Sequence, residues 1–236
     1  MSENYFKFKQ FTIYQNNCAM KVGTDGVLLG AFADVKNCSS ILDIGTGTGL
    51  IALMLAQKSE AKITAIEIDK DAYEQAVYNV ENSKFSNNIN VINSPIQDFA
   101  KTEIQRFDLI ISNPPFFQHH LKSGNKKKDI ARHSESLTYN ELIISAKSLL
   151  NNEGRFCVII PKDDEEYFTE LCNKTMLYLS RKLNIKPTPK KEIKRVILEF
   201  CFDNKKTERT ELIIEINGRH NYSEEYKKLT KDYYLT

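Results

Sequence analysis

Apolar residues along this chain occur in two alternating patterns, which predict strands and helices in turn. Short, nearly continuous apolar runs are typical of buried strands, and they occur at 41–45, 63–67, 88–92, 107–112 and 155–160. Apolar residues at helical spacing follow at 50–57, after Asp69, and after a capping box formed by Thr138 and Glu141. This alternation predicts an α/β protein with a doubly wound, mostly parallel sheet that helices cover on both faces.

The two ends of the chain follow different patterns. Residues 194–202 and 210–216 read as two strands joined by a charged turn, which predicts an antiparallel hairpin at the edge of the sheet. Ahead of the core, aromatic and apolar residues over 6–13 predict another short hairpin, and 24–33 predicts a helix. The proline-containing linker 186–190 lies inside this fold and separates no domains.

The amino-acid composition limits the classes of protein to which this chain can belong. A chain of 236 residues with 41% hydrophobic and 27% charged residues suits one sizeable core and excludes disordered, collagen-like and coiled-coil chains. We expect one domain over 1–236, with 1–35 as an N-terminal extension and 36–236 as the core with its C-terminal tail. No apolar run approaches the roughly 20 residues of a membrane span, and no secretory signal is present, so we expect a cytoplasmic protein. The five cysteines never form a C-x-x-C pair, which favours reduced thiols over zinc or disulfides.

Positive charge is confined to three stretches of the chain. The net charge of +2 conceals +2 over 1–21, +4 over 118–133 and +6 over 181–195, so the remaining residues carry −10. Such segregation suits a polyanionic partner. Solvated lysines on exposed loops would produce the same pattern, and charge alone leaves both interpretations open.

A glycine-rich loop follows the first strand of the core. Residues 43–49 read D-I-G-T-G-T-G, and Gly45, Gly47 and Gly49 permit a close backbone approach where a doubly wound sheet binds a nucleotide. The spacing differs from the dinucleotide pattern G-x-G-x-x-G, so no pyrophosphate is required. Glu67 ends the next strand, 18 residues after Gly49, where its carboxylate can accept hydrogen bonds from both hydroxyls of a ribose.

Further residues extend this candidate nucleotide site. Asp98, after the third strand, is placed to accept a hydrogen bond from an adenine amino group, with Ile68 and Phe99 as walls for the ring. A glycine turn with two surface acids is the alternative. The arrangement resembles motif I of the class I S-adenosylmethionine-dependent methyltransferases, which implies a Rossmann-like sheet of seven strands and S-adenosylmethionine as cofactor. The resemblance also implies that Asp43 helps to hold the amino group of the cofactor and that Glu67 binds its ribose.

A second candidate motif, Asn113-Pro114-Pro115-Phe116, directly follows the fourth strand. Two prolines often end a strand, so a purely structural turn is one interpretation. The other is chemical: an exocyclic amine or amide nitrogen is a poor nucleophile, and the Asn113 oxygen and Pro114 carbonyl can accept both of its N–H bonds. Phe116 can stack on the planar target. The sequence matches the [DNS]-P-P-[YFW] signature of amino-methyltransferases, in which we expect Asn113 to border the cofactor as well.

Resemblance to one family extends over nearly the whole chain. Segments 21–30, 113–117, 131–133 and 222–234 are similar to the bacterial tRNA1(Val) (adenine(37)-N6)-methyltransferases, and the last is the most specific. This implies methylation of N6 of adenosine 37, beside the anticodon of valine tRNA, without a metal. Phe116 stands where tyrosine is frequent, so stacking survives and a phenol hydroxyl is lost.

With an RNA substrate, the three positively charged stretches would bind phosphates around an unstacked base. The residues that we expect to contact RNA are Lys126, Lys127, Lys128, Arg132, Lys190 and Lys191.

Alternatives remain from the residues alone. An N5-glutamine methyltransferase acting on release factors carries the same Asn-Pro-Pro loop, as do other rRNA or tRNA amino-methyltransferases. Only about 40 residues precede motif I, fewer than the helical N-terminal domain of release-factor enzymes usually needs. A nucleotide-binding or RNA-binding protein without catalysis is less compatible with an intact Asn113. Asp25 either begins a helix or contacts cofactor or base, and His119 and His120 lack the further ligands of a metal site.

Overall fold

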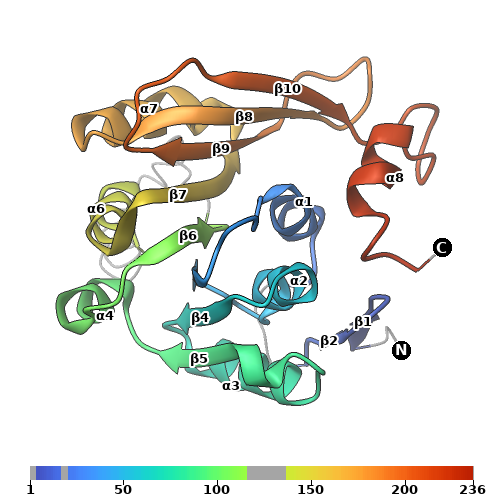
Figure 1. The fold of residues 1–236 in the computed structure, drawn as a ribbon. Coiled ribbons are helices and arrows are strands. Elements are labelled where there is room, and N and C mark those ends of the chain that lie inside the picture. The colour runs from blue at the N-terminus through green and yellow to red at the C-terminus, as the bar shows by residue number, and fades with distance from the viewer. Residues whose placement is uncertain (1–3, 17–20, 116–136, 236) are drawn as a thin grey trace, which may run out of the picture.

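The computed structural model describes residues 4–16, 21–115 and 137–235, which form a three-layer sandwich of helices, sheet and helices (Figure 1). The eight-stranded sheet has the order β10-β8-β9-β7-β6-β3-β4-β5. Among these described strands, β9 alone runs against the others. The strands are β3 (Ser40–Ile44), β4 (Lys62–Glu67), β5 (Ile89–Asn93), β6 (Phe107–Ser112), β7 (Leu150–Pro161), β8 (Tyr178–Lys186), β9 (Arg195–Cys201) and β10 (Glu208–Ile213). The predicted doubly wound α/β class is confirmed.

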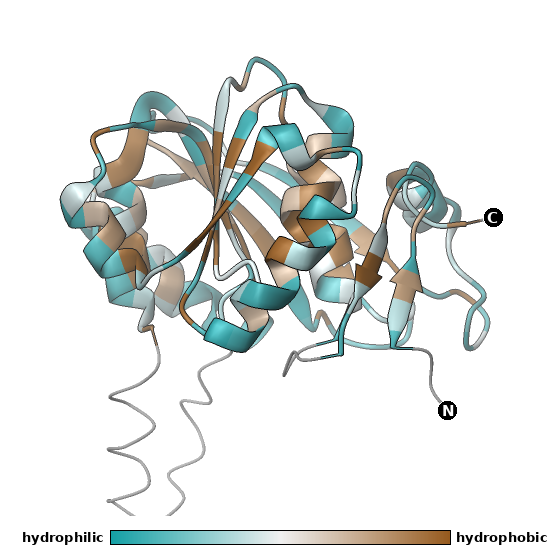
Figure 2. Ribbon diagram, turned by 90° about the horizontal axis from the view of Figure 1, so that it is seen from below, coloured by the Kyte–Doolittle hydropathy of each residue, from teal (hydrophilic) through white to brown (hydrophobic). Residues whose placement is uncertain are grey.

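Helices cover both faces of the sheet, and apolar residues gather on the strands and on the inner sides of the helices (Figure 2). One face carries α1 (Thr24–Phe32), α2 (Leu50–Lys58) and α3 (Lys70–Glu81). The other carries α4 (Ile96–Thr102), α6 (Tyr139–Leu149) and α7 (Glu165–Lys174). Two short 3-10 helices are η1 (Ser86–Asn88) and η2 (Lys162–Asp164). None of the helices in the described part of the chain is long and apolar enough to cross a bilayer.

Local capping signals begin two of these helices where the sequence predicts them. The Ala72 N–H donates to Asp69 Oδ1 at 2.8 Å, at the start of α3. Thr138 and Glu141 form the predicted capping box of α6, each side chain accepting the backbone N–H of the other. Both predictions are confirmed.

One end of the sheet differs from the sequence-based expectation. The strands at 194–202 and 210–216 form no hairpin, because β8 lies between them, antiparallel to β9 and parallel to β10. The sheet therefore has eight strands where seven were expected. The charged residues of β8 interrupt the apolar pattern by which a strand is recognised in the sequence. Two of them form ion pairs in the sheet: Arg181 Nη1 lies 3.3 Å from Glu199 Oε2, and Lys182 contacts Glu165.

The two ends of the chain pack together beyond α1 and α2. The ring of Phe8 lies 5.8 Å from that of Tyr234, and the Lys9 N–H donates to the Tyr233 carbonyl at 2.8 Å. The tail residues that carry the family resemblance thus anchor the N-terminal hairpin. That hairpin, predicted over 6–13, is confirmed. The elements are β1 (Tyr5–Lys7), β2 (Thr12–Tyr14) and α8 (Glu224–Thr230).

Asp108 ties three strands together at the amino edge of the sheet. Its Oδ2 accepts hydrogen bonds from the N–H groups of Ser39 (2.8 Å) and Ser40 (3.0 Å), and its Oδ1 accepts one from Asn151 Nδ2 (2.6 Å). Burial alone would raise the pKa of Asp108, but the hydrogen bonds, with those of Ser39 first, lower it to about 2.

We expect Asp108 to contribute acid-sensitive stability. Because its folded pKa lies below the ordinary value of 3.8, the contribution is present above that value and is lost as the pH falls toward about 2. The difference in unfolding free energy between wild type and Asp108→Asn, measured by urea denaturation, should shrink by on the order of 1 kcal/mol between about pH 5 and about pH 2.5. Asp203→Asn, in an exposed turn, serves as the control. A difference for Asp108→Asn that stays constant with pH would contradict this role.

Candidate active site

The glycine loop turns sharply between β3 and α2 and leaves its outer side open. Gly45, Gly47 and Gly49 have φ of 71°, 57° and 81°, a region that disfavours other residues. A Cβ at Gly45 or Gly47 would meet no atom within 4 Å, whereas one at Gly49 would touch Ala76 at 3.6 Å. The first two glycines therefore border free space in which a ligand can approach the backbone.

Asp43 lies under this loop as a fully buried carboxylate. Thr46 Oγ1 donates to its Oδ2 at 2.6 Å, and the Ala52 N–H in α2 also acts on the carboxylate, while Oδ1 is buried and accepts no hydrogen bond of regular geometry from the described residues. Burial raises the pKa of Asp43 to about 7, and the charge of Glu67 adds to the rise. A cationic donor at Oδ1, such as an ammonium group, would offset the cost of burying the charge and would favour the ionised form of Asp43.

Glu67 lies beside the same loop. Its Oε2 accepts a hydrogen bond from the Gly47 N–H at 2.8 Å, and its Oε1 accepts one from the Asp69 N–H at 3.0 Å. Asn93 Nδ2 donates to the Glu67 carbonyl at 2.8 Å and braces the turn. A carboxylate has about four acceptor positions, so the two oxygens retain capacity for two hydroxyl donors.

The residues expected around an adenine ring lie in different environments. Ile68 is 62% exposed just beyond β4, and Asp98 is exposed in the first turn of α4, where it pairs with Lys101 at 2.9 Å. Phe99 is only 7% exposed and packs in the core beside Ile96. Of these three residues, Ile68 and Asp98 thus present their side chains to solvent, whereas Phe99 is largely covered.

Asn113 follows β6 at the same edge of the sheet. Ser112 Oγ donates to the Ile44 carbonyl at 2.9 Å, and the two residues are register partners, so the ends of β6 and β3 lie together. Asn113 Oδ1 is buried and, like Asp43 Oδ1, accepts no hydrogen bond from the described residues. Buried acceptors without partners are rare and destabilising. Two of them at one edge suit a ligand and a substrate that donate hydrogen bonds.

Comparison with known proteins agrees with this geometry. Residues 20–174 match the model of the methyltransferase small domain. The chain belongs to this family. Proteins named tRNA1(Val) (adenine(37)-N6)-methyltransferase from Phocaeicola vulgatus and Bacteroides thetaiotaomicron are 50% and 46% identical to it, over 100% of this chain and 99% of theirs.

Solved structures of methyltransferases share the fold. A predicted O-methyltransferase from Agrobacterium tumefaciens superposes with a TM-score of 0.68 at 19% identity, covering 89% of this chain and 96% of its own. The tRNA m1G37 methyltransferase of M. jannaschii superposes with a TM-score of 0.60 at 18% identity, covering 86% of this chain and 57% of its own. These similarities concern the fold alone. Within the described residues, no cluster of histidine, cysteine or acidic side chains could hold a metal.

The structure describes only some of the residues of this methyltransferase-family chain that we expect to contact RNA. Phe116, Lys126, Lys127, Lys128 and Arg132, together with His119 and His120, fall outside the described residues. Lys190 and Lys191 are exposed in the loop between β8 and β9, which lies at the edge that also carries Asn113.

The positively charged stretch 181–195 is a loop only in its middle, because 181–186 belong to β8 and Arg195 begins β9. Four of its cations take part in ion pairs: Arg181 with Glu199, Lys182 with Glu165, Lys186 with Glu211, and Arg195 with Asp25.

Asn79 supports the loop and was not anticipated from the sequence. It is fully buried in α3, and its Nδ2 donates to the carbonyls of Thr48 and Tyr14, each at 2.9 Å. Its Oδ1 accepts the Tyr14 N–H at 2.9 Å. Asn79 therefore joins the glycine loop to the N-terminal hairpin. Its position one turn after Ala76 on the apolar side of α3 was the available signal.

Proposed function

We propose that this protein transfers a methyl group from S-adenosylmethionine to N6 of adenosine 37 in tRNA1(Val), in the cytoplasm. The observation that carries the proposal is the pair of buried acceptors, Asp43 Oδ1 and Asn113 Oδ1, that have no hydrogen-bond partner among the described residues and lie beside an open glycine loop. A ligand with an ammonium group suits the first, and a substrate amine suits the second. The relatives at 50% and 46% identity over their full length support the choice of substrate.

The residues around the loop suit each part of the cofactor. Asp43 Oδ1 would accept a hydrogen bond from the methionine ammonium group, and the open side of Gly45 and Gly47 would let the methionine part approach. Glu67 would use its remaining acceptor positions for the ribose hydroxyls. Ile68 and Asp98 would contact the adenine, since Ile68 is exposed just beyond β4 and Asp98 is exposed in the first turn of α4.

The residues after β6 would prepare the amine. When bound, S-adenosylmethionine supplies a methyl group on positively charged sulfur, which leaves as a neutral thioether as the attacking nitrogen bonds to carbon and gives up a proton. Asn113 Oδ1 and the Pro114 carbonyl would accept the two N6–H bonds and turn the nitrogen lone pair out of conjugation with the ring. Phe116 would stack on the base.

RNA contacts are assigned to the carboxyl edge of the sheet. Lys190 and Lys191 are exposed there, and the chain that contains Lys126, Lys127, Lys128 and Arg132 leaves the same edge after Pro115. Flipping adenosine 37 out of an anticodon loop needs less energy than extraction from a duplex, so a loop substrate fits a site of this kind.

The decisive experiment offers labelled S-adenosylmethionine with competing acceptors. We expect N6-methyladenosine in nuclease digests of unmodified valine tRNA, and no label when adenosine 37 is replaced by guanosine. A release-factor protein tests the N5-glutamine alternative, and rRNA fragments test other amino-methyltransferase substrates. Label on the protein alone would overturn the RNA assignment.

Salt dependence provides an independent prediction for the basic residues. Lysine contacts to phosphate release counterions, so the logarithm of tRNA affinity should fall linearly with the logarithm of salt concentration. Neutralising Lys126, Lys127 and Lys128 with alanine should flatten that slope by up to about two units. Lys205 and Lys206, exposed in the loop between β9 and β10 at the opposite edge of the sheet, form the matched control, whose replacement should leave the slope unchanged. Equal slopes for both sets would contradict the placement of the RNA.

A further inference from the structure

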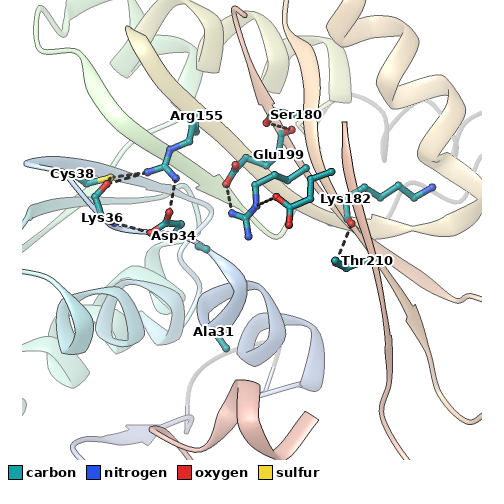
Figure 3. A network of polar contacts seen from close by, with 12 residues as sticks. Ala31, Asp34, Lys36, Cys38, Arg155, Ser180, Lys182, Glu199 and Thr210 are labelled. Carbon is teal, nitrogen blue, oxygen red and sulfur yellow. Dashed lines mark hydrogen bonds and ion pairs between the residues drawn. The ribbon is translucent and has the colours of Figure 1, made fainter. Parts of the chain in front are cut away.

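Helix α1 is joined to the sheet by an ion pair at each end. At its start, Arg195 Nε donates to Asp25 Oδ2 at 2.8 Å. Just beyond its end, Arg155 Nη1 lies 3.4 Å from Asp34 Oδ2, and the Arg155 side chain points toward Asp34 in Figure 3. Arg155 lies in the first half of β7, whereas Arg195 pairs in register with Pro161 at the end of β7. The helix therefore crosses the sheet with its first turn at the edge that carries the active site.

The first turn of α1 also lies against the helix that follows the glycine loop. A Cβ at Gly26 would approach Leu50 Cδ2 to 3.1 Å, and Leu50 is the residue directly after Gly49. This close approach leaves little room between α1 and the start of α2. Any displacement of the first turn of α1 would thus reach the loop to which we assign the cofactor.

On its other side, the same ion pair reaches toward the Asn-Pro-Pro segment. Val158 in β7 is the register partner of Ser112 in β6, and Pro161 faces Arg195 in β9. Two strand spacings, about 10 Å, thus separate Arg195 from the segment that follows Ser112. Arg195 thus links the first turn of α1 to the strands that lead to the acceptor segment.

We propose that Asp25 and Arg195 are positioning residues, whose ion pair fixes the first turn of α1 between the glycine loop and the acceptor site. This inference rests on the proposed methyl transfer. Transfer between two bound partners depends steeply on their geometry, and a misplacement of about 1 Å can lower a rate by about a hundredfold. The ion pair holds this turn toward β9.

A structural role for the same pair would have different consequences. Both side chains are partly exposed, 30% for Arg195 and 26% for Asp25, and partly exposed ion pairs contribute little to stability. The far end of α1 stays tied without Asp25, because Lys58 Nζ donates to the Gly30 carbonyl at 2.8 Å and Asp34 keeps its partner. Removing the Asp25 charge should therefore leave the helix folded and loosen only its first turn.

The test compares Asp25→Asn with Asp34→Asn, the same substitution at the other end of the same helix. We expect Asp25→Asn to lower the single-turnover rate of methyl transfer by about tenfold with saturating cofactor and tRNA. Asp34→Asn should remain within about twofold of wild type. The melting temperatures of the two variants should agree. A change in long-range attraction between the protein and tRNA would leave this rate unchanged, because tRNA is saturating.

A charge exchange provides the second measurement. The double variant Asp25→Arg with Arg195→Asp should be several-fold faster than Asp25→Arg alone, because the pair is re-formed in reverse. Equal rates for Asp25→Asn and Asp34→Asn, or no rescue by the exchange, would overturn the positioning role. All rates are taken relative to wild type on whichever acceptor the wild type methylates. Failure of wild type to label tRNA therefore refutes the substrate assignment, while the ratio between variants still decides the role of the pair.

Discussion

Replacing Asn113 by alanine should lower the single-turnover rate of methyl transfer by a hundredfold or more, about the effect of removing one preorganised polar group from an active site. The affinity for S-adenosylmethionine, measured by calorimetry, should change by less than about threefold. The physical reason is the acceptor at Oδ1, which is buried without a partner among the described residues and suits an N6–H donor. Without this acceptor, the lone pair of the N6 nitrogen stays delocalised into the adenine ring, and the amine remains a poor nucleophile.

Measuring the stability of Asn113→Ala distinguishes a loss of catalysis from misfolding. Removing a buried acceptor that has no partner should leave the unfolding free energy unchanged or slightly higher, since no hydrogen bond within the described protein is lost. Asn113→Asp is the informative companion, because it keeps an acceptor oxygen at this position and should retain more activity than the alanine variant. If Asn113→Ala methylates at nearly the wild-type rate with unchanged stability, another group activates the amine.

Replacing Glu67 by alanine should weaken S-adenosylmethionine binding by about 1.5 to 3 kcal/mol, the range for a hydrogen-bonded charged group. That corresponds to about a tenfold to hundredfold rise in the dissociation constant. Two effects add: the ribose loses its acceptor, and the N–H groups of Gly47 and Asp69 lose theirs. Calorimetry well below the melting temperature measures the change.

Glu74→Ala is the matched control for this measurement. Glu74 is an exposed glutamate in α3 whose carboxylate pairs only loosely with Lys70, at 3.7 Å. Its removal should leave cofactor affinity unchanged. An unaltered affinity for Glu67→Ala would place the ribose elsewhere and return Glu67 to a purely structural role in holding the glycine loop.

The amino-acid sequence by itself determined the elements that hold the site. Gly45, Glu67 and Asn113 each lie where a predicted strand ends, and the carboxyl ends of parallel strands meet at one edge of a doubly wound sheet. Knowing the fold class was therefore enough to expect these residues together, and hydrogen bonds join the glycine loop to Glu67 and the end of β6 to the end of β3. The capping residues Asp69 and Thr138 were predictable for a related reason, since a cap contacts only its own first turn.

The tertiary structure alone decided how the last strands pair and which charges stay free. The pattern of β8 contains Arg181 and Lys182, which read as loop residues until Glu199 and Glu165 are placed beside them. Phe99, expected to face a ligand, packs with Ile96 in the apolar cluster between the sheet and helices α4, α6 and α7.

Local sequence patterns also could not identify the residues that position the site. Asp25 and Arg195 are 170 positions apart, and Asn79 joins three segments of the chain. Periodicity reports only which face of an element is buried, so contacts that depend on one element crossing another leave no pattern in the sequence.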